Sequence, residues 1–221
     1  TTGTFAMAKQ FDSHSMVASL HKHYSLNELC DFFKSDDSSN SFYTLGTGPK
    51  DRDKLNKVSN EVPINNICID VANGYTDYFV DAVSEIRSKF PKSIIMAGNV
   101  STPEMVQELV LQGGVDIVKI GIGPGSACTT RLVAGVGYPQ LSAIIECADA
   151  AHGLNSHICA DGGCKTPADV VKALGAGADF VMLGGMIAGT DECQGEWEWE
   201  ADMVWGKAGN NPSVAATVKV D

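Results

Sequence analysis

The sequence has no paired cysteines with metal-binding spacing, no excess of basic residues and no long apolar run. Its seven cysteines are scattered, and none lies in a C-x-x-C pair, which argues against a structural zinc site and a disulfide framework. A reducing, cytoplasmic location therefore fits best. The net charge of −11 and the pI near 4.8 argue against nucleic acid as a partner, because nonspecific binding needs a basic surface.

Other familiar signals are missing as well. No apolar segment has membrane-spanning length and there is no signal-peptide pattern, so no membrane partner is expected. No G-x-G-x-x-G motif follows the first predicted strand, which disfavours an open, doubly wound dinucleotide-binding sheet. The chain begins at Thr1 without an initiator methionine, so we expect a fragment or a trimmed chain.

What the sequence does contain is a regular alternation of strand and helix signals. Strands are predicted at residues 16–20, 42–45, 66–72, 93–97, 116–120, 157–160 and 179–183. Helices are predicted at 4–14, 25–33, 51–58 and 141–151, and after the caps at 76, 102 and 166. Six of the seven strands are followed by a helix, and such alternation predicts a parallel sheet with right-handed crossovers.

An internal repeat sharpens this prediction. The pattern of a strand, Gly98, a Thr102-Pro103 helix start and a second strand recurs about 64 residues later, from Gly162 and Thr166-Pro167. Repeated βαβ units favour a (β/α)8 TIM barrel, incomplete at both ends, with its missing strand expected before Thr1. We therefore expect an incomplete barrel over residues 1–190. Residues 191–221 are predicted to be a divergent extension, with strands near 196–200 and 214–220.

The loop at residues 121–131 is the strongest candidate for chemistry. It follows a buried strand, contains three glycines and a proline, and carries Cys128 near its end. A thiol reacts as its thiolate. Nearby backbone N–H groups, or a cation such as Arg131, lower the pKa of the thiol. A buried structural cysteine is the alternative, but it is less compatible with a glycine-rich loop after a strand.

Two glycine pairs follow the last two predicted strands. In barrels the loops after the final strands often hold phosphate, and Gly162-Gly163 and Gly184-Gly185 occupy those positions. Glycines let backbone N–H groups approach an anion, and the adjacent Asp161 can accept ribose hydroxyls. Plain turn glycines are the simpler alternative.

Several other polar residues at strand ends leave their roles open. Lys119 would form a Schiff base, as in an aldolase, if it were desolvated inside the barrel. His21 and His23 are either a metal-binding H-x-H pair or ordinary histidines, and no carboxylate partner is evident. Asp70 is either a functional group or a simple turn former.

Several motifs together resemble one enzyme family. Residues 121–130 (GIGPGSACTT) resemble the catalytic-cysteine loop shared by IMP dehydrogenases and GMP reductases. Residues 21–25 (HKHYS) and 68–75 (CIDVANGY) resemble GMP reductases specifically. Residues 135–140, 161–163 and 182–186 also fit, and the resemblance runs from about residue 3 to about residue 196.

The resemblance implies NADPH-dependent reductive deamination of GMP to IMP and ammonia. Cys128 would attack C2 of guanine to give a covalent thioimidate, and Thr130 would relay a proton to the leaving ammonia. Matched nucleotide-binding positions are Asp161, Gly162, Gly163, Gly184 and Gly185. Matched NADPH-binding positions are Lys22, Asp70, Val71, Ala72, Ile122 and Gly123. A monovalent cation, K⁺, would be bound by carbonyls at Gly123, Gly125 and Cys128, with Arg131 adjacent.

The resemblance also implies a homotetramer, as well as features that this sequence lacks. The family carries a Gly-Met-Ser segment after position 196 and then a flap glutamate that partners the threonine. Neither is found, and Trp205-Gly206-Lys207 is at best a distant echo. We therefore expect the full-length parent to be a GMP reductase and this chain alone to be weakly active or inactive. The alternatives are an IMP dehydrogenase and a noncatalytic nucleotide-binding remnant.

Overall fold

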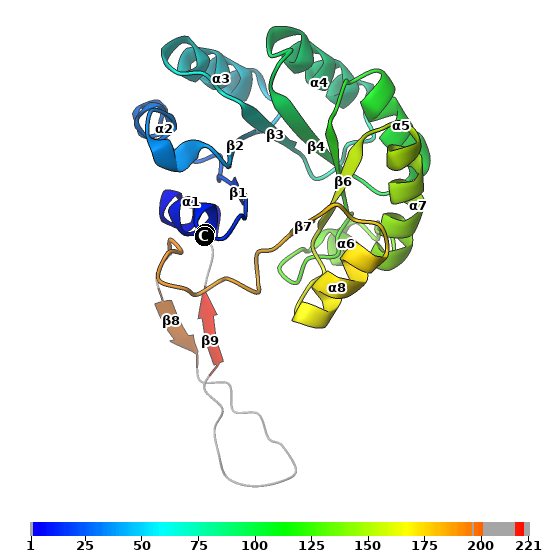
Figure 1. The fold of residues 1–221 in the computed structure, drawn as a ribbon. Helices are drawn as coiled ribbons and strands as arrows, with labels where there is room; N and C mark the ends of the chain where they lie inside the picture. The colour runs from blue at the N-terminus through cyan, green and yellow to red at the C-terminus, as the bar shows by residue number, and fades with distance from the viewer. Residues whose placement is uncertain (1, 196, 201–214, 219–221) are drawn as a thin grey trace, which may run out of the picture.

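A computed structural model describes residues 2–195, 197–200 and 215–218 and shows an α/β fold of alternating strands and helices (Figure 1). The strands are β1 (Ala18–Ser19), β2 (Ser41–Leu45), β3 (Asn66–Asp70), β4 (Ile94–Val100), β5 (Ile117–Ile120), β6 (His157–Asp161), β7 (Phe180–Met182), β8 (Trp197–Glu200) and β9 (Ala215–Val218). The α-helices are α1 (Phe5–Asp12), α2 (Leu26–Phe33), α3 (Pro49–Glu61), α4 (Asp77–Lys89), α5 (Pro103–Leu111), α6 (Thr130–Val133), α7 (Gln140–Gly153) and α8 (Pro167–Gly175). One 3₁₀ helix, η1, covers Asp36–Ser38.

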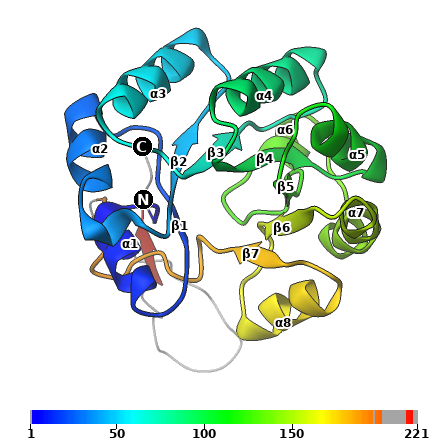
Figure 2. The same ribbon diagram turned by 45° about the horizontal axis from the view of Figure 1, so that its top comes forward.

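The first seven strands form one parallel sheet in the order of the sequence, β1 to β7. The sheet curves, and helices α2 to α5, α7 and α8 lie along its outer face (Figure 2). β1 and β7 are its two edges, and within the described residues no ladder joins them. The predicted TIM barrel, incomplete rather than closed, is therefore confirmed.

Strands β2 to β6 are mostly buried on both faces, which explains their nearly continuous apolar sequences. Alternate residues point to opposite faces of a strand, so in β3 Ile67 and Ile69 pack against the helices while Cys68 faces inward. Cys68 joins a small inner cluster with Met96 of β4 and Cys159 of β6. Packing against the helices on one face and within the inner cluster on the other holds the carboxyl ends of neighbouring strands in register. The predicted site residues lie at these carboxyl ends.

Local signals for helix starts are confirmed at several positions. Ser25 and Glu28 form a capping box at α2, and the Thr76 hydroxyl accepts a hydrogen bond from the Phe79 N–H at the start of α4. The prediction for α3 was too short, because the helix begins at Pro49 and continues to Glu61. Proline is favoured at the first helical position, where its missing N–H costs nothing.

Two strand predictions need correction. β1 is only Ala18–Ser19, because the Met16 N–H bonds back to the Phe11 carbonyl of α1 instead of joining the sheet. β4 does not end before Gly98 but continues to Val100 through an irregularity in its pairing with β5. A glycine that looks like a terminator in the sequence thus lies inside a strand.

The C-terminal strands form a separate sheet. β8 pairs with β9 in antiparallel fashion, which confirms the hairpin that the alternating pattern near 196–200 predicts. The boundary near residue 190 stays a prediction, and Trp205-Gly206-Lys207 lies outside the described residues.

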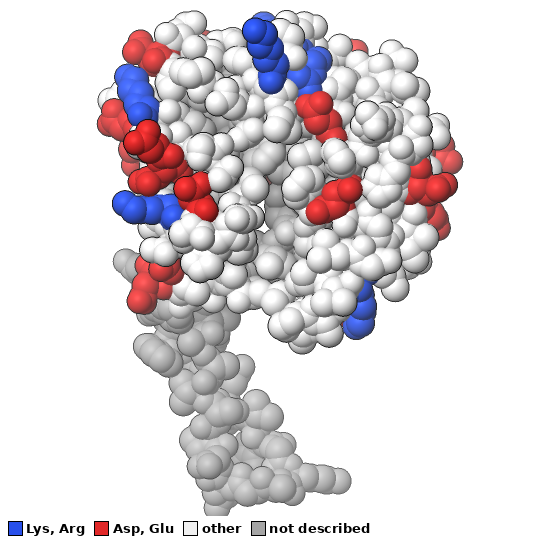
Figure 3. Space-filling view, in the orientation of Figure 1, with Lys and Arg blue, Asp and Glu red and all other residues white. Residues whose placement is uncertain are grey.

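The surface agrees with the acidic composition. On the face in Figure 3 the charged side chains of the described residues are scattered among uncharged ones and form no basic patch. In the part of the chain that the structure describes, no helix combines the length and the apolar character needed to span a membrane.

Candidate active site

Cys128 lies on the exposed loop that follows β5. Its Sγ is 3.2 Å from the hydroxyl oxygen of Thr130, and its backbone N–H donates to the carbonyl of Gly125 at 3.1 Å. The pKa of the Cys128 thiol is lowered, chiefly by its hydrogen bond with the Thr130 side chain. The Thr130 backbone N–H lowers it further, and the charge of Arg131 contributes to a lesser degree. A larger thiolate fraction near neutral pH makes Cys128 a candidate nucleophile.

The sequence suggested that the cysteine loop is irregular throughout, but the structure shows a helical turn in it. Thr130–Val133 forms the single helical turn α6 directly after Cys128. The guanidinium of Arg131 does not pair with the thiol: it donates to the carbonyls of Ile122 at 3.3 Å and Tyr138 at 2.5 Å. Arg131 therefore mainly joins the start of the loop to the segment after α6, and activation by this cation is a minor effect.

A second cluster lies at the carboxyl ends of β3, β5 and β6. The ammonium of Lys119 contacts Asp161 Oδ2 at 2.5 Å and Asp70 Oδ1 at 2.6 Å. Burial alone would lower the pKa of Lys119, but the carboxylate of Asp161, the Cys68 sulfur and the carboxylate of Asp70 together raise it. A protonated ammonium is not a nucleophile, so the aldolase interpretation of Lys119 is disfavoured.

These two carboxylates and Lys119 line a cavity of about 330 Å³. Lys22, which comes from the segment after β1, reaches the same cavity, as does Met182 at the end of β7. One exposed cation and two partly exposed carboxylates suit a ligand that carries both phosphate and ribose hydroxyl groups.

The Asp161-Gly162-Gly163 turn lies directly against the cysteine loop. Gly162 and Gly163 have φ of +91° and +90°, which favours glycine. A Cβ on Gly162 would lie 3.0 Å from the Gly125 nitrogen, so the two loops approach backbone to backbone. Gly184 and Gly185 are exposed beyond β7, and a Cβ on either would meet open space.

Comparison with known proteins identifies the relatives of this arrangement. Residues 34–214 match the sequence profile of the "IMP dehydrogenase / GMP reductase domain". The chain belongs to the IMP dehydrogenase / GMP reductase family. It is 55% identical over 199 residues to GMP reductase 1 of Homo sapiens, and over 200 residues to a GMP reductase of Caenorhabditis elegans. These alignments cover 89% of this chain but 57% and 56% of the relatives, so the chain spans little more than half their length.

The structure of this family member brings some of the predicted residues together and leaves others apart. Cys128 and Thr130 are in contact, and Asp161 is joined to Asp70 through Lys119. Val71 bonds through its backbone to Gly98 and Asn99 of β4. Ala72 is exposed, Ile122 is buried, and Gly123, with a φ of +73°, packs against the Arg131 side chain.

Three further residues hold the site together, and the sequence reasoning assigned this role to none of them. Asn99 donates from Nδ2 to Asp161 Oδ2 and to the Gly121 carbonyl, both at 2.9 Å. Gln140 donates to the Ile120 carbonyl at 2.9 Å and, more weakly, to the Asp161 carbonyl. Lys119 was considered only as a nucleophile. Polar residues just beyond or within apolar strands are a usable signal for such a network.

The H-x-H pair gives no metal centre. His21 bonds to the Gln194 side chain at 2.8 Å and stacks on Tyr24, and burial lowers its pKa. Across the described residues, no group of three or more His, Cys, Asp or Glu side chains converges as a metal site would require.

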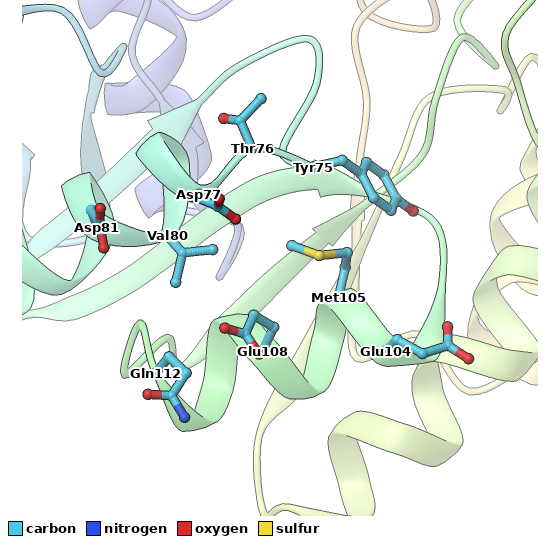
Figure 4. Close-up of a pocket in the computed structure, with 9 residues that line it drawn as sticks. All are labelled: Tyr75, Thr76, Asp77, Val80, Asp81, Glu104, Met105, Glu108 and Gln112. Carbon is cyan, nitrogen blue, oxygen red and sulfur yellow. The ribbon is translucent and has the colours of Figure 1, made fainter.

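A larger groove of about 480 Å³ lies between α4 and α5, on the outside of the sheet. Figure 4 shows its acidic side chains, Asp77 and Asp81 from α4 and Glu104 and Glu108 from α5. The groove is separate from the cavity that Lys22, Asp70, Lys119 and Asp161 line, and none of the residues expected to form the site lies in it.

Proposed function

We propose that this chain is the larger part of a GMP reductase, which converts GMP to IMP and ammonia with NADPH as the reductant. The observation that carries the proposal is the contact of Cys128 with Thr130 on a loop packed against Gly162. The relatives of this chain named above are GMP reductases, which favours GMP reductase over IMP dehydrogenase.

In this mechanism the Cys128 thiolate adds to C2 of the guanine ring. The bond from C2 to the amino nitrogen then breaks, and Thr130 relays a proton to the departing ammonia, which leaves a thioimidate on Cys128. NADPH, when bound, supplies the hydride that C2 needs. The bond between carbon and sulfur finally breaks, so that IMP leaves and Cys128 is again a thiolate.

The nucleotide would be held by the turns beside the cysteine loop. Backbone N–H groups of Gly162, Gly163, Gly184 and Gly185 would bind its phosphate, and Asp161 would accept its ribose hydroxyls. Asp161 is suited to this role because its carboxylate is only partly exposed and is oriented by Lys119 and Asn99.

The residues beside the cavity fit NADPH by the chemistry of their donors and acceptors. Lys22 would pair with a phosphate and Asp70 would accept a ribose hydroxyl, with Val71, Ala72, Ile122 and Gly123 as further contacts. The loop carbonyls of Gly123, Gly125 and Cys128 are hard oxygen ligands that suit K⁺. The adjacent Arg131 holds the start of this loop through its hydrogen bond to the Ile122 carbonyl. We extend the proposal to a cytoplasmic homotetramer in which 191–221 is an extension of the barrel unit.

Intact-mass spectrometry of the protein incubated with GMP tests this function. We expect wild-type protein to gain the mass of GMP less ammonia, whereas Cys128→Ala gains none. Cys164→Ala is the matched control, because Cys164 adjoins the same turn but burial raises its pKa, and this variant should form the adduct normally. GMP binding without any adduct would instead support a noncatalytic remnant.

An assay of substrate pairs separates the two enzymes of the family. Turnover of GMP with NADPH and none of IMP with NAD is expected. The opposite preference would make the protein an IMP dehydrogenase and overturn the proposal.

A further inference from the structure

Lys119 connects two carboxylates that the proposed function gives to different ligands. Its side chain is only 3% exposed, and its ammonium lies between Asp161, assigned to the nucleotide, and Asp70, assigned to the dinucleotide. The three residues come from β5, β6 and β3, so contacts across the sheet rather than local sequence create the cluster.

The sheet is built to admit this lysine. Gly98 of β4 pairs in register with Lys119, and a Cβ at Gly98 would lie 2.4 Å from the Lys119 carbonyl oxygen and 2.6 Å from its Cβ. The lysine stem can therefore pass along the barrel interior beside Cys68 and Cys159, and only its charged end meets the cavity. Any larger residue at position 98 would displace the lysine backbone.

The hydrogen bonds divide the carboxylate oxygens between protein and ligand. Lys119 and Asn99 both donate to Oδ2 of Asp161, while Lys119 contacts Oδ1 of Asp70. Each carboxylate thus keeps one oxygen that Lys119 does not use. A carboxylate held in this way is an oriented acceptor for a hydroxyl group.

We propose that Lys119 is a positioning residue that fixes Asp161 and Asp70 together, and so aligns the nucleotide and dinucleotide sites with one buried ammonium. This inference rests on the proposed function for the identity of the two ligands. Loss of the ammonium would leave both carboxylates without their shared partner, and Asp161 would lose one of the two groups that orient it.

The test variant is Lys119→Met combined with Asp70→Asn. Lys119→Met alone leaves two unpaired carboxylates and risks unfolding. In the double variant only the Asp161 carboxylate remains charged, so the cluster keeps the net charge of −1 that it has in wild type. We expect calorimetry to show GMP binding roughly tenfold weaker than in wild type, the loss typical for coupled neighbours. Asp116→Asn is the control, because Asp116 pairs with Arg87 at the opposite end of β5.

Crystal structures without ligand give a second readout. In the double variant we expect the Asp161 carboxylate to leave its hydrogen bond with Asn99. Wild-type GMP affinity in the double variant, or an Asp161 carboxylate that stays in place, would overturn the inference. If wild-type protein binds no GMP while Asp161 still moves in the variant, the proposed function fails and the positioning role stands.

Discussion

At the scale of single residues, the decisive feature is the environment of one thiol among seven. Burial raises the pKa of Cys147 to about 12 and that of Cys68 to about 11. Cys128 differs because it is exposed and bonded to Thr130, which lowers its pKa. Selective reactivity at Cys128 therefore follows from its position on the loop rather than from the residue type.

Replacing Thr130 with valine should make Cys128 less reactive. Thr130→Val keeps the side-chain shape but removes the hydroxyl that stabilises the thiolate, so the pKa of Cys128 rises. We expect the rate of alkylation by iodoacetamide at pH 7 to fall roughly 2- to 10-fold, as for the loss of one hydrogen bond. Peptide mass mapping of the alkylated protein would measure it.

Thr129→Val is the matched control for that experiment. Thr129 is exposed at the start of α6, and its side chain makes no capping hydrogen bond. Its replacement should leave the alkylation rate unchanged. Equal slowing in both variants would mean that the Thr130 hydroxyl does not activate the thiol.

At the scale of elements, sequence patterns predicted most of the architecture. Short apolar runs and capping residues located the seven parallel strands and the helices that follow six of them. The failures were the lengths of β4 and α3, the shortness of β1 and the turn α6. Gly98 illustrates the reason: in the sequence it resembles a terminator, but the fold uses it to admit Lys119 from the next strand.

The candidate site was predictable where its residues are close in sequence. The loop carrying Cys128 and Thr130 is a single motif, so resemblance and chemistry agree on it. The Lys119 cluster joins residues 42 and 49 positions apart, and no local pattern encodes that contact. Charge pairing across a sheet depends on strand register, which only the folded chain defines.

The capping carboxylate of α8 gives a prediction about stability and pH. Asp169 accepts hydrogen bonds from the Lys165 and Thr166 N–H groups and the Thr166 hydroxyl, which lower its pKa from 3.8 to about 2. Because the folded-state pKa is depressed, this stabilisation is present above pH 3.8 and is lost as the pH falls through about 2. Asp169→Ala should lower the Tm at pH 7 by roughly 2–4 °C, in the range for a helix cap.

Thermal melts of both proteins over pH 7 to 2 measure this effect. The Tm difference between wild type and Asp169→Ala should shrink across the acid window and be largest at neutral pH. Asp53→Ala removes an exposed carboxylate that pairs with the equally exposed Lys57 in α3, so it should change the Tm little. A constant Tm difference at every pH would show that Asp169 does not act through its charge.

At the scale of the whole molecule, the sheet is open within the described residues, and the loop that carries Cys128 is exposed. Leu132 and Val133 of α6, directly after the reactive pair, are 87% and 82% exposed. Enzymes that transfer hydride to a covalent intermediate need the site closed to water. Within the described residues, no segment covers the proposed nucleophile and the turns proposed to bind the nucleotide, and the chain spans 57% of GMP reductase 1 of Homo sapiens.

Turnover by this chain alone should consequently be weak, although the adduct with GMP still forms. We expect GMP-dependent loss of NADPH absorbance to be roughly 100-fold slower than for a full-length GMP reductase measured in parallel, a cost comparable to that of misplaced reacting groups. In the proposed mechanism the adduct forms at Cys128 beside Thr130 and the neighbouring turns, all of which this chain contains, so mass spectrometry should detect it even when turnover is negligible. The contrast between the two assays separates chemistry at the cysteine from closure of the site. Turnover equal to that of the full-length enzyme would mean that this open arrangement excludes water in another way and that exposure of α6 does not limit the reaction.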